Sequence, residues 1–203
     1  MEILENKEIK NGISYNDYKS IVFKLAEESK SSGESTEERI AATLMNAQRI
    51  KRIDKQCEIK IELKAVIDTI SEKYLWVLIT ESWCGDGAQC IPVIAKMASL
   101  SDNIELSLIF RDENLDIIDS FLTNGSRSIP KLICFKKIDA TVIGTWGPRP
   151  KAIQNMVSKY KNNNPNVSHD EFVKNLHLWY ARDKTNALQN EFVDLIKEWV
   201  EDI

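Results

Sequence analysis

Apolar residues recur at helical spacing through the first third of the chain. The spacing predicts an amphipathic helix from Ser14 to about Lys30, followed by a break at residues 31–34. A capping box at residues 35–38 then opens a second helix toward Lys55, and a third helix is expected over residues 58–71. The first third of the chain is therefore predicted to be helical, with few candidate functional residues.

The middle of the chain alternates short apolar runs with helical patterns. The last two apolar runs are joined too tightly for a crossover helix, so they should pair antiparallel. The order strand, helix, strand, helix, strand, strand predicts an α/β fold in which helices cover a mixed β-sheet. The expected strands are 74–80, 104–110, 131–135 and 141–145. Between them, residues 85–87 lead into a helical pattern that continues through Ala98, and a further helix is expected at 113–122.

The last third of the chain is again helical in pattern. A helix is expected after Pro150 to about Tyr160, a breaker at residues 162–166, and one more long helical region from Ser168 nearly to the end. The apolar stripe of this last region should dock on the chain's own core, with a homodimer contact through the terminal helices as the alternative. The resulting division is an N-terminal helical extension packed on the core at residues 1–57, an α/β domain at 58–162, and a C-terminal helical extension at 163–203.

Composition and charge exclude several classes of protein. Among the 203 residues, 43% are hydrophobic and 29% charged, which is typical of a globular protein, and the low content of glycine and proline disfavours an all-β fold. The net charge of −4 offers no basic surface, so we expect neither nucleic-acid nor membrane partners. The N-terminal residues lack a signal-peptide pattern, and a cytoplasmic location is expected, where the four sparse cysteines stay reduced.

The segment Trp83-Cys84-Gly85-Asp86 is the first candidate for chemistry, because it joins a buried strand to a helix. At that position the unpaired amides and the positive end of the helix dipole should lower the pKa of the Cys84 thiol and make it reactive. A second segment, Ile129-Pro130, places proline before a strand, where a cis peptide is tolerated and can bring backbone close to a neighbouring site.

Taken together, these two segments and the final strand pair resemble the thioredoxin superfamily. The variant Trp-Cys-Gly-Asp and the added N-terminal helices resemble a bacterial subgroup of thioredoxin-like proteins with a single cysteine in the motif. The resemblance implies a thioredoxin-like domain at residues 58–162, with Cys84 as the nucleophile and Pro130 as the cis-proline of the substrate groove. It implies a substrate-binding surface formed by Trp83, Gly85, Asp86, Ile129 and Pro130.

The sequence departs from the family pattern where the second thiol should be. Gly87 stands at the position of the usual resolving cysteine, and Cys90 lies a further turn along the helix. Six helical residues separate two side chains by about 9 Å of rise and roughly 240° of rotation, so Cys90 reaches Cys84 only if the first turn opens. Cys90 is therefore expected to be a small buried residue. A carboxylate at Asp86 should raise the pKa of Cys84 and oppose the dipole, or else serve as an N-terminal helix stabiliser.

Two functions from different classes remain at this point. The first is a thiol oxidoreductase in which Cys84 forms a mixed disulfide with a protein or small-molecule thiol, resolved by an external thiol or, second in order, by Cys90. The alternative is a non-catalytic thioredoxin-fold module that binds a partner. A peroxidase is disfavoured because Glu81 replaces the hydroxyl residue expected three positions before the cysteine. No metal or organic cofactor is implied, and His169 and His177 are interpreted as surface or packing residues.

Overall fold

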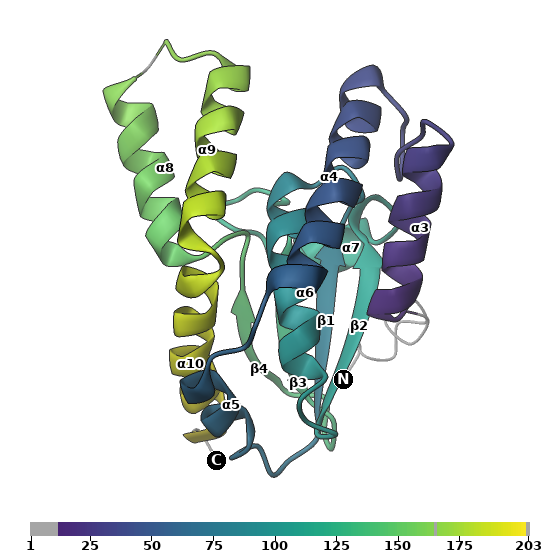
Figure 1. Cartoon of the computed structure of the whole chain (residues 1–203). Coiled ribbons are helices and arrows are strands. Elements are labelled where there is room, and N and C mark those ends of the chain that lie inside the picture. The colour runs from purple at the N-terminus through teal and green to yellow at the C-terminus, as the bar shows by residue number, and fades with distance from the viewer. Residues whose placement is uncertain (1–11, 165, 202–203) are drawn as a thin grey trace.

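The computed structural model describes residues 12–164 and 166–201 and places a four-stranded sheet behind a layer of helices (Figure 1). The strand order is β2-β1-β3-β4, with β1 and β2 parallel and the other two pairs antiparallel. This arrangement confirms the predicted mixed sheet. The strands are β1 Tyr74–Thr80, β2 Ile104–Phe110, β3 Lys131–Lys136 and β4 Val142–Trp146.

The first two helices, α3 (Tyr15–Glu27) and α4 (Glu37–Gln56), begin at the expected capping residues. Ser14 Oγ accepts a 3.1 Å hydrogen bond from the Asp17 amide, and Thr36 Oγ1 accepts a 3.3 Å bond from the Arg39 amide. Such bonds satisfy amides that the first turn of a helix leaves unpaired. In Figure 1, α4 lies in front of α6 (Gly85–Ala98), and it packs against both α6 and α3.

Alternating residues of β1 divide the core between the two faces of the sheet. Trp76 and Leu78 belong to a large cluster shared with α3, α4, α6 and the C-terminal helices, whereas Val77 and Ile79 belong to a smaller cluster that includes Cys84 and Ile129. The alternation follows from the two-residue period of a strand. The smaller cluster is closed by α7 (Leu115–Asp119), through its buried residues Ile117 and Ile118.

Two central helices are shorter than predicted. The third helix is α5 (Ile61–Ile67) rather than residues 58–71, and α7 follows a 3₁₀ turn, η1 (Arg111–Glu113), instead of filling residues 113–122. Neither helix has a side-chain cap at its N-terminus. In addition, four of the five residues of α7 are aspartate or isoleucine, which favour helix weakly, so packing rather than propensity sets its length.

The helical region predicted from Ser168 onward is divided into two helices. Helix α8 (Lys151–Asn163) is followed by α9 (His169–Asp183) and α10 (Asn186–Glu201), and the chain turns between the last two at Lys184 and Thr185. Both turn residues have left-handed backbone angles, with φ of 51° and 70°. Because neither is glycine, asparagine or proline, the sequence carried no ordinary sign of this break.

Helix α10 is attached to the sheet by aromatic packing. The ring of Phe192 lies 5.7 Å from that of Trp76 on β1 and 5.5 Å from that of Trp146 on β4. Trp199 contacts Trp76 edge to face at 6.0 Å. The apolar stripe predicted for the C-terminus thus packs on the chain's own core. Among the described helices, none combines the length and apolar character required to cross a membrane.

Candidate functional site: the cysteine at the start of α6

Cys84 is the N-cap of α6 and faces the loop that precedes β3. Its Sγ accepts a 3.2 Å hydrogen bond from the Gly87 amide, and its thiol donates to the Ile129 carbonyl oxygen at 3.4 Å. The Ile129–Pro130 peptide bond is cis. The structure therefore brings together Cys84, Ile129 and Pro130, which come from two separate segments of the sequence. All four cysteines of the chain are free and buried.

Burial overturns the expectation that the pKa of Cys84 is lowered. Only 6% of the residue is exposed, and desolvation raises the pKa of its thiol to about 12, with a further increase from the Asp86 carboxylate. The Gly87 amide and the more distant cations Arg149 and Arg111 act in the opposite direction, but they are outweighed. The Cys84 thiol is consequently protonated at neutral pH in this closed arrangement.

Asp86 is the centre of a polar cluster beside the thiol. It forms an ion pair with Arg149, whose Nε lies 3.0 Å from Asp86 Oδ2, and it accepts a 2.7 Å hydrogen bond from the Tyr180 hydroxyl. Arg149 lies between β4 and α8, while Tyr180 lies on α9. The first turn of α6 is therefore fixed by contacts from the C-terminal third of the chain.

The position of the missing second cysteine is tightly enclosed. A Cβ atom added at Gly87 would lie 2.8 Å from Thr80 Oγ1 and 3.3 Å from Cys84 Sγ, so any side chain there requires Thr80 to move. Cys90 is fully buried, and its Sγ lies 3.8 Å from the Tyr180 hydroxyl. Burial raises the pKa of Cys90 well above its ordinary value. The close packing around Gly87 and the burial of Cys90 are both consistent with a site that has a single thiol at the start of α6.

Trp83 lies under two guanidinium groups. The Arg39 Cζ atom is 4.5 Å and the Arg111 Cζ atom 4.9 Å from the centre of a Trp83 ring, and both arginines pair with Asp112. Such cation–π contacts orient the ring. The Trp83 Nε1 atom is buried and has no hydrogen-bond partner within the described chain. It is a free donor close to the cysteine.

The loop before Cys84 is held by the N-terminal helices. Asn46 of α4 donates a 2.9 Å hydrogen bond to the Ser82 carbonyl oxygen, and the Ser32 amide donates to Ser82 Oγ at 2.8 Å. The buried Glu81 carboxylate accepts hydrogen bonds from Ser32 and from the Asp112 amide, while its desolvation raises its pKa. The residues of the N-terminal extension thus contribute to the position of Cys84.

His177 is the residue near this site that sequence reasoning missed. A Cβ atom added at Gly85 would lie 3.0 Å from His177 Cε1 and Nε2, so the imidazole covers the start of α6. Its Nδ1 atom accepts a 3.2 Å hydrogen bond from Gln89. Burial and the nearby cations Arg49, Arg52 and Arg149 lower the pKa of His177 to about 4. Nothing in the sequence pattern of α9 distinguishes this histidine from a packing residue.

The remaining predicted roles can be placed on the same structure. Gly85 and Asp86 adjoin the thiol in the first turn of α6, whereas His169 is exposed at the start of α9. Across residues 12–164 and 166–201, no three His, Cys, Asp or Glu side chains gather into a group that could hold a metal ion.

The comparisons with known proteins agree with this architecture. Two solved structures, each 16% identical to the chain, are similar in fold: a protein of unknown function from Pseudomonas aeruginosa and an HIV epitope scaffold. The first has a TM-score of 0.63 and covers 93% of this chain and 94% of its own. The second has a TM-score of 0.52 and covers 91% of this chain and 98% of its own. No curated protein matches the chain.

A family model described as Thioredoxin matches residues 33–161. The match includes the Cys84 segment, the Ile129–Pro130 loop and all four strands. Because this match spans more than half of the chain, the protein belongs to the thioredoxin family.

Proposed function

We propose that the protein is a thiol oxidoreductase that uses Cys84 as a single nucleophilic thiol. The Cys84 thiolate attacks a disulfide of a protein or small molecule, forming a new bond between Cys84 and one sulfur while the other sulfur leaves as a thiolate. An external thiolate then attacks the mixed disulfide, forms a disulfide with the bound sulfur and releases Cys84 as a thiolate. The two steps exchange disulfide partners without net oxidation of the protein.

The observation that carries this proposal is the position of the Cys84 sulfur. It lies 3.2 Å from the Gly87 amide and 3.4 Å from the Ile129 carbonyl oxygen, at a helix start facing a backbone segment. The Gly87 amide stabilises a thiolate, and Arg149 and Arg111 add favourable charge. Since desolvation is the main cause of the high pKa, activation requires that the thiol be uncovered when a disulfide binds.

An external thiol is the preferred resolving group. Gly87 stands where a second cysteine would act, and the Cys90 sulfur contacts Tyr180 from within an unbroken helix. Resolution by Cys90 would need α6 to unwind from its first turn, which remains the second route. A reducing compartment such as the cytoplasm would supply the external thiol.

The second candidate function is a binding module that uses the thioredoxin fold without thiol chemistry. The burial of Cys84 and its pKa of about 12 favour this function, because a thiol kept protonated is a poor nucleophile. Trp83, with its unpaired Nε1 donor, and the Ile129–Pro130 backbone would then form the surface that holds a partner.

The test is the formation and release of a mixed disulfide on the native protein. The intact chain is incubated at pH 8 with bis(2-hydroxyethyl) disulfide, and adducts are located by mass spectrometry of peptides. The thiol-exchange proposal expects an adduct on Cys84 that 2-mercaptoethanol removes, with repeated turnover when both reagents are present. Cys84→Ser should lose the adduct and the turnover.

Cys90→Ser is the matched control, since it removes a second buried thiol of the same helix. It should retain the Cys84 adduct and its release by 2-mercaptoethanol. Release of the adduct from the wild type without added thiol, with formation of a Cys84–Cys90 disulfide that this variant cannot form, would instead assign Cys90 as the resolving thiol. If Cys84 reacts only after the protein is denatured, thiol exchange is rejected and the binding module stands.

A further inference from the structure

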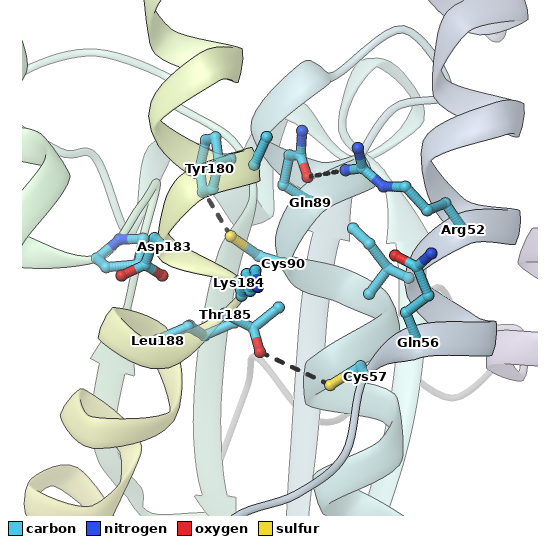
Figure 2. A pocket seen from close by; sticks show the side chains of 13 residues that line it. Arg52, Gln56, Cys57, Gln89, Cys90, Tyr180, Asp183, Lys184, Thr185 and Leu188 are labelled. Carbon is cyan, nitrogen blue, oxygen red and sulfur yellow. Dashed lines mark hydrogen bonds between the residues drawn. The ribbon is translucent and has the colours of Figure 1, made fainter.

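A cavity lies beside α6, between the end of α4 and the turn that joins α9 to α10 (Figure 2). Its volume is about 180 Å³. The residues that surround the Cys84 thiol, namely Trp83, Ile129 and Pro130, do not line it. An engineered apolar cavity of about 150 Å³ in another protein binds benzene, so this space can hold a body the size of one aromatic ring.

The lining combines an apolar interior with two cations. Ile53, Leu188 and Pro150 contribute apolar surface, and the thiols of Cys57 and Cys90 add small polarizable groups. The Cys90 sulfur faces the Tyr180 hydroxyl, and the Cys57 sulfur lies 3.8 Å from Thr185 Oγ1 (Figure 2). Arg52 and Lys184, both exposed, also line the cavity, so its charged groups are at solvent-accessible positions.

The cations near this cavity lack carboxylate partners. Within the described residues, no ion pair includes Arg49, Arg52 or Lys184. Arg49 is only partly exposed, and burial together with the like charge of Arg52 lowers its pKa to about 10. Asp86 counters part of this repulsion, but Asp86 is already paired with Arg149. A bound anion would relieve the repulsion between Arg49 and Arg52.

Gln89 connects these cations to the cavity. Its side chain lines the cavity, its Oε1 atom accepts a 3.3 Å hydrogen bond from Arg52, and its Nε2 atom donates to His177. Asp183, whose carboxylate accepts hydrogen bonds from the Ala187 amide at the start of α10, is the one acid in the lining, against the two cations Arg52 and Lys184. The charge presented to a ligand is therefore positive.

The turn at Lys184 and Thr185 is a third observation at the same place. A β-branched residue such as Thr185 is rarely found at a φ of 70°, and strained backbone of this kind clusters at ligand sites. Both residues of the turn line the cavity.

From these observations we propose that the cavity binds a small carboxylate with an apolar ring or branched aliphatic group. The apolar group would lie between Leu188 and Cys90, and the carboxylate would pair with Arg52. This site is separate from the thiol chemistry proposed for Cys84 and does not depend on it. Lys184 lines the same cavity and adds to the positive charge that favours an anion over its neutral analogue. The volume of the cavity restricts the apolar group of the ligand to about one aromatic ring.

Isothermal titration calorimetry with three probes tests this site. Benzoate should bind with one-to-one stoichiometry. Benzyl alcohol should bind at least tenfold more weakly because it lacks the negative charge, and acetate should not bind because it lacks the aromatic ring. Arg52→Gln should weaken benzoate binding about tenfold, the effect of losing one charge-assisted hydrogen bond. Lys55→Gln removes an equal charge from an exposed position of α4 outside the cavity, and it should leave binding unchanged.

A second variant removes the space rather than the charge. Ala181→Phe places a large side chain at an exposed, helix-compatible position that lines the cavity, so the protein should fold and lose benzoate binding. The same titration on Cys84→Ser should match the wild type. The proposal is overturned if benzoate fails to bind the wild type, if benzyl alcohol binds equally well, or if Arg52→Gln and Ala181→Phe bind like the wild type.

Discussion

The Tyr180 hydroxyl donates a 2.7 Å hydrogen bond to Asp86 Oδ1, joining α9 to the first turn of the helix that carries the cysteine. The bond is buried, and the same Asp86 carboxylate is ion-paired with Arg149. After desolvation by burial, the charge of the Asp86 carboxylate is the second cause that raises the pKa of Cys84, so α9 contacts a group that affects the ionisation of the thiol. The added helices are therefore part of the electrostatic surroundings of the site.

Tyr180→Phe should lower the free energy of unfolding by about 1.5–3 kcal/mol, the range for hydrogen bonds to charged groups. Urea denaturation followed by circular dichroism measures the change. Tyr160→Phe is the control, because the Tyr160 hydroxyl accepts a 2.8 Å bond from the neutral Asn175 side chain, and it should cost about 0.5–1.5 kcal/mol. An equal or smaller loss for Tyr180→Phe would contradict the importance of the buried bond to Asp86.

Local signals predicted the strands and the position of Cys84, but not the groups around it. The run Tyr74–Thr80, the break at Gly85 and the proline before the strand at Ile129-Pro130 are visible within a few residues of sequence, whereas the role of Pro130 in a substrate groove came from the family resemblance. His177 and Tyr180 reach α6 only through tertiary packing of α9, which no local pattern encodes. The pKa of Cys84 was predicted in the wrong direction for the same reason, because burial depends on the whole fold.

Asp86→Asn should lower the pKa of Cys84, because it removes the carboxylate that disfavours the thiolate. The alkylation rate of Cys84 by iodoacetamide, followed against pH by peptide mass spectrometry, should rise about tenfold for each unit by which the pKa falls. Arg149→Gln removes a favourable cation and should shift the profile to higher pH.

The opposite shifts expected for Asp86→Asn and Arg149→Gln distinguish an effect of charge on the pKa of Cys84 from an effect of loosened packing. If the broken Asp86–Arg149 pair only opened the site, both variants would react faster than the wild type. Asp54→Asn, which removes another ion-paired carboxylate bonded to Lys19 and Tyr15, should leave the Cys84 profile unchanged.

His177 should make the protein less stable in acid. Its pKa is about 4 in the folded chain against about 6.5 when unfolded, so between these values the unfolded state binds the extra proton. The free energy of unfolding should fall by about 1.4 kcal/mol per pH unit as pH drops from 6.5 to 4 because of this residue. His177→Gln should remove that part of the slope in urea denaturation.

His169→Gln is the matched variant for this measurement, since His169 is exposed on the same helix. It should keep the wild-type dependence on pH. A His177→Gln protein with an unchanged acid slope would show that the imidazole is charged in the folded state.

Cys134 should destabilise the protein in alkali. Burial in β3 raises the pKa of its thiol to about 12, whereas an unfolded thiol ionises near 8.5, so stability present below about 8.5 is lost as pH rises toward 12. The cost is about 1.4 kcal/mol per pH unit within that window. Cys134→Ala should be less stable than the wild type at pH 7, and the difference should shrink by this amount per unit above 8.5. Ile133→Val, a neighbouring core truncation without a titrating group, should keep a constant difference, and a parallel course for Cys134→Ala would refute the assignment.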